Sequence, residues 1–262
     1  MLEARTFIRL FRQEQFFIFL GAIILIILAW AYIFHLSLAM PIDSMNPKVN
    51  VLTKPQTNYW GSNDLLSALL MWFIMMTAMM LPSAMPMILI FSAYNKKRLL
   101  EGNQFVPTWI FVLGYLLIWF GFSILTTVLQ FVLHNAAIIS IDMKVINPFI
   151  SGLILIGAGI YQFAPIKNVC VKNCQSPFGF IMENWREGKI GSLIMGLHHG
   201  LYCVGCCWAL MLLLFAAGIM NLLWIAVISI FVFLEKTARG YWLGRIAGLL
   251  LAVWGFVMII AY

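Results

Sequence analysis

Long apolar stretches constrain this chain more than any other feature. We place seven of them at about 16–36, 65–91, 107–133, 148–166, 191–217, 219–235 and 242–261. Each is close to the roughly 20 apolar residues that cross a bilayer, and backbone in lipid must satisfy its own hydrogen bonds, so such stretches form helices. With 63% apolar and 10% charged residues, the chain does not fit a water-soluble domain. The sequence therefore predicts an all-α polytopic transmembrane bundle, built as a single integral membrane domain over 1–262.

The net charge of +7 is explained by membrane orientation. If the N-terminus is cytoplasmic, thirteen of the 16 Lys and Arg residues lie at inner ends, and Lys48, Lys54 and Lys144 lie outside. This distribution predicts an N-in/C-out, multi-pass protein of the cell membrane. No basic block is interleaved with aromatic residues, so we expect the lipid bilayer as a partner and no nucleic acid.

The first apolar stretch is also compatible with a signal peptide, because basic residues precede it. Its run of about 18 apolar residues is long for the core of a signal peptide, so we interpret 16–36 as a retained helix. The polar segment 37–64 predicts an outer loop, since it is rich in turn-forming residues. The segment 167–190 is the longest expected inner loop, in which a short helix could lie on the membrane surface.

Glycine spacing marks two helices expected to pack closely against neighbours. Gly240, Gly244 and Gly248 share one face of the last helix, and Gly196 and Gly200 share one face of the fifth. Residues without side chains let a second backbone approach. We therefore expect the fifth helix to lie at the centre of the bundle.

All five cysteines lie between 170 and 207, close to two of the four histidines. At about 100° per residue, Met195, His199, Cys203 and Cys206 fall on one helix face, with Cys207 at its edge and His198 on the flank. Ionisable groups inside a bilayer are expensive and usually serve a function. The candidate metal ligands from this region are His199, Cys203, Cys206, Cys207, His198, Cys170, Cys174 and Met195.

The second helix supplies thioethers. Met75 and Met79, and likewise Met76 and Met80, are spaced at i and i+4. Methionine is also an adaptable apolar filler, but next to the Cys/His face these four are further candidate ligands. At about 1.5 Å per residue, His199 and Cys203 lie about 12 and 18 Å from the inner end, a depth that overlaps the methionines. Cys170 and Cys174 are expected at the inner mouth, below this group.

Ligand softness indicates the metal. Thiolate and thioether favour Cu(I), whereas imidazole with thiolate also suits zinc. Calcium and magnesium require oxygen ligands, and we expect no carboxylate embedded in the membrane. The C-x-x-C of Cys203 and Cys206 leaves a reversible disulfide open as an alternative chemistry.

These motifs resemble those of a bacterial and archaeal family described as predicted metal-binding integral membrane proteins, which has no established activity. The similar segments are 78–83 (AMMLPS), 158–167 (AGIYQFAPIK), 170–177 (CVKNCQSP), 195–208 (MGLHHGLYCVGCCW), 220–224 (MNLLW) and 235–236 (EK). The resemblance covers most of 70–240 and implies metal binding. Since one histidine of the pair is often replaced in that family, it also implies that His199 matters more than His198.

The sequence favours a membrane protein that handles Cu(I), either moving it across the membrane or delivering it to a membrane cuproenzyme. A metallochaperone is a further expected partner. Two alternatives remain, an accessory subunit of a larger membrane complex and a thiol–disulfide oxidoreductase. Methionines have no role in disulfide exchange, so the sequence leans away from an enzyme.

Overall fold

The computed structural model describes residues 2–42, 60–102, 104, 106–139, 145–238 and 240–261, with only the backbone at 2–15 and 38–42. Secondary structure in these residues is helical, apart from one isolated bridge between Ile139 and Val145. The all-α prediction is therefore confirmed. The helices are α1 (Leu2–Ile42), α2 (Ser62–Leu100), α3 (Thr108–Asn135), α4 (Pro148–Tyr161), α5 (Pro165–Gln175), α6 (Pro177–Asn184), α7 (Gly188–Ala217), α8 (Leu222–Thr237) and α9 (Trp242–Ile260).

The helices only partly match the expected set of spans. Within the described residues, five helices are long and apolar enough to cross a membrane: α1, α2, α3, α7 and α9. The bent pair α4 and α5 gives a sixth if it is counted as one span. At 16 residues, α8 is shorter than these. Five or six helices are compatible with a membrane protein, while the count of seven and the orientation remain predictions. Most of the expected outer loop, including Lys48 and Lys54, lies outside the described residues, as does Lys144.

The span expected at 148–166 is interrupted. α4 ends at Tyr161, and α5 starts at Pro165 after a bend of 65°. Proline lacks an N–H and disfavours helical backbone in the residue before it, and Ala164 is accordingly extended (φ −64°, ψ 133°). The expected inner loop is also largely helical, since α5 and α6 fill most of it.

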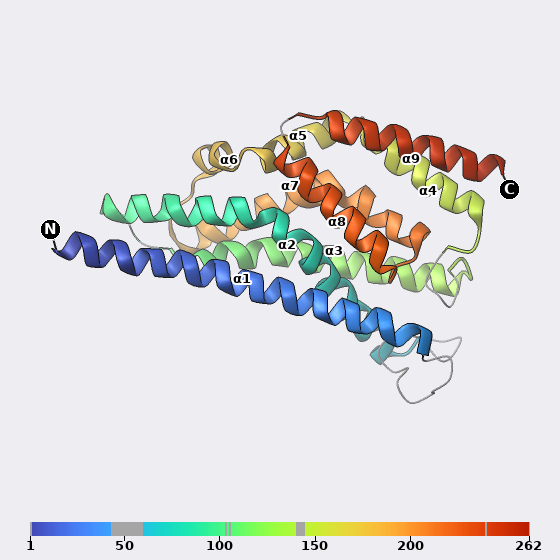
Figure 1. The fold of residues 1–262 in the computed structure, drawn as a ribbon, viewed down its shortest axis with the longest axis horizontal. Helices are drawn as coiled ribbons and strands as arrows, with labels where there is room; N and C mark the ends of the chain where they lie inside the picture. Colours follow the sequence, from blue (N-terminus) through green and yellow to red (C-terminus); the bar gives the residue numbers. More distant parts are fainter. Residues whose placement is uncertain are drawn as a thin grey trace.

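The bundle has a buried centre and two flanks. The two termini lie at opposite ends of the long axis, with α1 on one flank against α2 and α9 on the other against α4 (Figure 1). The most apolar window of α7 is 61% buried, against 17% for α9. α7 contacts α3, α4, α5 and α8, which confirms its expected central position.

Prolines shape α2. Pro82 and Pro86 lie inside this helix, which bends part-way along its length (Figure 1). Proline at 82 cannot bond to the carbonyl four residues earlier, that of Ala78. The Trp30 indole of α1 donates to this carbonyl at 3.2 Å, so the freed acceptor ties α1 to α2.

Glycines give the closest helix contacts. A Cβ on Gly196 would lie 2.1 Å from the Phe111 carbonyl oxygen, and one on Gly114 would lie 2.4 Å from that of Leu193. α3 and α7 therefore meet backbone to backbone, as the Gly196/Gly200 spacing predicts. In the last helix, Gly248 packs in the same way against α4. Gly240 does not belong to that face, because it precedes α9 and has a positive φ of 98°.

Candidate metal centre

The central helix α7 presents its sulfur and imidazole side chains to the core. Met195, His199, Cys203, Cys206 and Cys207 are all buried, with at most 3% of any residue exposed, whereas His198 is only half-buried. The face predicted from helical periodicity is thus buried, and its role as a set of ligands stays a prediction. All five cysteines of the chain are free thiols.

Cys203 lies at the meeting point of four helices. The Lys236 ammonium of α8 donates to Cys203 Sγ at 2.9 Å, and the Tyr115 hydroxyl of α3 lies 3.1 Å from the same sulfur. From α2, Ser83 Oγ accepts from Lys236 at 3.0 Å. A cation beside a cysteine sulfur stabilises the thiolate, which is the form that binds metals.

Cys207 brings a methionine into the same cluster. Its Sγ lies 3.8 Å from Met80 Sδ, and Cys203 lies one helical turn earlier on the same face of α7. The Met80 carbonyl oxygen accepts from the Tyr115 hydroxyl at 3.1 Å. The expected meeting of the second helix with the cysteine face is therefore confirmed at Met80. The other three candidates, Met75, Met76 and Met79, are equally buried.

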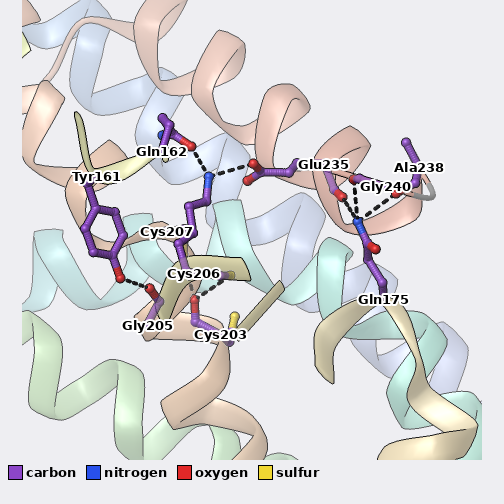
Figure 2. Close-up of polar contacts among 11 residues, drawn as sticks. Tyr161, Gln162, Gln175, Cys203, Gly205, Cys206, Cys207, Glu235, Ala238 and Gly240 are labelled. Atoms are coloured by element: carbon purple, nitrogen blue, oxygen red, sulfur yellow. Dashed lines mark hydrogen bonds and ion pairs between the residues drawn. The ribbon is translucent and has the colours of Figure 1, made fainter. Parts of the chain in front are cut away.

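One turn of α7 also holds its own thiols in place. Cys206 Sγ and Cys207 Sγ donate to the Cys203 carbonyl oxygen at 3.0 and 2.9 Å (Figure 2). In the described part of the chain, no three His, Cys, Asp or Glu side chains are arranged to hold a metal ion. The sulfur that another helix brings next to Cys207 is the thioether of Met80.

The two cysteines of α5 are not below the cluster, as the sequence predicts, but beside it. The bend before Pro165 turns α5 against α7. The side chains of Cys174 and Cys206 lie close enough to interact electrostatically. Cys170 Sγ lies against Gly205, where a Cβ would be only 2.8 Å away.

A buried ion pair fixes α5 to α8. The Lys167 ammonium donates to Glu235 Oε1 at 2.6 Å and also to the amide oxygen of Gln162 (Figure 2). The side chains of Lys167 and Glu235 are 2% and 4% exposed. The expectation of no embedded carboxylate is therefore wrong, because Glu235 is carried into the core at the end of α8 and neutralised there.

His199 is one turn from Cys203 but has different surroundings. Its ring stacks on Tyr115 and Phe111 with centroids 5.5 and 6.0 Å away, and Phe180 meets it edge-on at 5.6 Å. Its Nδ1 is buried and has no hydrogen-bond partner among the described residues. Met195 Sδ, one turn earlier, accepts from the Arg186 backbone N–H at 3.4 Å.

Sequence reasoning missed the residues that complete the centre. Five of these residues lie within the segments that carry the family resemblance: Lys236, Ser83, Lys167, Glu235 and Gln162. The sequence explains the two lysines as charges at helix ends and predicts no role for the other three. Tyr115 lies outside those segments. Its available signal was a hydroxyl-bearing ring in the middle of an apolar stretch.

The comparisons with known proteins give one match, which is to a protein family. No curated protein and no solved structure matches the chain. The model of a family described as "Copper chaperone" (PpoB2) matches residues 69–258, which include every residue of the cluster around Cys203. The chain therefore belongs to this copper chaperone family.

Proposed function

We propose that this protein is a multi-pass chaperone of the cell membrane that binds Cu(I) at Cys203, Cys207 and Met80 and delivers it to a membrane cuproenzyme. The observation that carries the proposal is the convergence of two cysteine sulfurs and one methionine sulfur in the core. Thiolate and thioether donors select Cu(I). The family description favours delivery over transport across the membrane.

Charge balance supports the choice of metal. Two thiolates around Cu(I) carry one net negative charge, and a buried charge requires a partner. The Lys236 ammonium at 2.9 Å from Cys203 Sγ supplies the matching positive charge. Zinc prefers four ligands in a closed tetrahedral site, and no three His, Cys, Asp or Glu side chains of the described residues are grouped to provide one.

Substitution of the two thiols tests the proposal. Cys203→Ala and Cys207→Ala should each weaken Cu(I) binding by more than about 100-fold, the upper end of the effect expected from losing an outer-sphere partner. Affinity is measured on the purified full chain by competition with the Cu(I) chelator bicinchoninate, alongside the melting temperature. His198→Ala is the matched control, since His198 lies on the same helix and is only half-buried. Wild-type affinity in both cysteine variants would contradict the proposal.

A further inference from the structure

α5 presents one sulfur-bearing face to α7. Lys167, Cys170, Val171 and Cys174 follow helical spacing, and of these Cys170 alone is not buried. The ion pair of Lys167 with Glu235 holds the first turn of α5. At its last residue, the Gln175 amide donates to the carbonyl oxygens of Glu235 and Ala238 at 2.8 and 2.7 Å (Figure 2). Both ends of α5 are thus anchored to α8, and the two cysteines lie between the anchors.

The five thiols form a continuous series from the core outward. Cys206 lies on the same turn as Cys203 and Cys207, and its side chain lies close enough to Cys174 to interact with it electrostatically. Cys174 and Cys170 are four residues apart on one helix, where neighbouring Cβ atoms are about 5–6 Å apart. Cys170 is half-buried, whereas the other four cysteines are buried.

Gly205 leaves space for the side chain of Cys170, the half-buried cysteine of this series. A Cβ at this position would lie 2.8 Å from Cys170 Sγ, so the glycine lets that sulfur sit directly on the turn of α7 that carries Cys206. The Tyr161 hydroxyl donates to the Gly205 carbonyl oxygen and keeps this turn fixed from α4 (Figure 2). The close contact between α5 and α7 at this point thus includes the thiol of Cys170.

We propose that Cys206, Cys174 and Cys170 are a transfer route, along which Cu(I) passes by thiol exchange from Cys203 and Cys207 to the half-buried Cys170, where an acceptor thiol or thioether takes it. This inference rests on the proposed function and adds the path by which Cu(I) leaves the core site. In each exchange a new Cu–S bond forms as an old one breaks. The incoming thiol gives up a proton, the departing thiolate takes one up, and copper stays Cu(I). No oxidant or reductant is required.

The test separates holding copper from releasing it. The purified full chain, loaded with one Cu(I), is mixed with excess reduced glutathione, and the rate of copper transfer is measured together with the Cu(I) affinity. Cys170→Ser should leave the affinity within about twofold and slow the transfer at least tenfold. Cys170→Met keeps a soft donor and should restore part of the rate, which a packing role of Cys170 would not predict. Asn173→Ala, a matched control on the same helix, should behave as wild type.

The possible outcomes distinguish this route from the proposed function. A wild-type transfer rate in Cys170→Ser, with normal affinity, overturns the route and leaves the core site intact. A lowered affinity in Cys170→Ser also overturns it, because Cys170 would then be a ligand of the resting site. The melting temperature shows whether Cys170→Ser stays folded, and Cys174→Ser is a second variant for which the route predicts equally slow transfer.

Discussion

Two buried polar regions of this bundle differ in where their side chains find hydrogen-bond partners. Along α3, the hydroxyls of Ser123, Thr126 and Thr127 donate to carbonyl oxygens three or four residues earlier on the same helix, at 2.8–3.1 Å. Around Cys203, polar groups of α2, α3, α7 and α8 instead contact one another. Burial is nearly complete in both regions, except at Ser83, which is half-buried.

The difference shows what marks a functional centre inside an apolar bundle. A hydroxyl that bonds back to its own helix is satisfied locally and needs no neighbour. Lysine, cysteine and tyrosine side chains drawn from separate helices form one network, so removing Cys203 takes one hydrogen-bond partner from both Lys236 and Tyr115. Convergence between helices, rather than burial alone, therefore distinguishes the Cys203 cluster from the α3 hydroxyls.

The largest effect on stability is expected where two charges depend on each other. Lys167→Met leaves Glu235 charged and unpaired in the core, and breaking a buried pair in this way costs about 3–5 kcal/mol of unfolding free energy. The double variant Lys167→Met/Glu235→Leu removes both charges and should recover most of that loss. Denaturant unfolding in detergent measures both. If Lys167→Met lowered the unfolding free energy by less than about 1 kcal/mol, the ion pair would contribute no more to stability than one of the α3 hydroxyl hydrogen bonds.

Most of the fold was predictable from hydrophobicity, because every expected apolar stretch except 148–166 became a single helix. The glycine contacts of α7 were predictable too, since close approach needs only the spacing of Gly196 and its neighbours. The break before Pro165 was missed because Phe163 and Ala164 continue the apolar run, which hides the turn. That error placed Cys170 and Cys174 below the cluster instead of beside it.

The site was predictable only where one helix carries it. The face of α7 follows from helical periodicity alone, so His199, Cys203 and Cys206 could be grouped from sequence. Lys236 and Tyr115 reach Cys203 from other helices, and no spacing rule relates residues on separate helices. For the same reason, the sequence could not predict that Met80, rather than Met75, Met76 or Met79, lies next to Cys207.

The second prediction sharpens the comparison within α2 itself. Met80→Leu removes the sulfur 3.8 Å from Cys207 Sγ and should weaken Cu(I) binding about tenfold, or about 1.4 kcal/mol. Met75→Leu is the matched control, since Met75 is equally buried and should keep its affinity. Both swaps conserve volume and should change stability by less than about 1.5 kcal/mol. Chelator competition and thermal unfolding on the same preparations check this. If both variants lost the same affinity for Cu(I), Met75 would contribute to copper binding as much as Met80 does.

The smallest effect is expected in the α3 layer. Thr127→Val keeps the shape of the side chain and removes the hydroxyl that donates to the Ser123 carbonyl oxygen at 2.8 Å. That carbonyl is still an acceptor for the helix backbone, so no buried group loses its last partner, and the loss of unfolding free energy should stay below about 1 kcal/mol. Cu(I) affinity and transfer to glutathione should match wild type. If copper transfer fell while stability held, the α3 hydroxyls would belong to the copper route, and convergence between helices would no longer distinguish the functional region from the structural one.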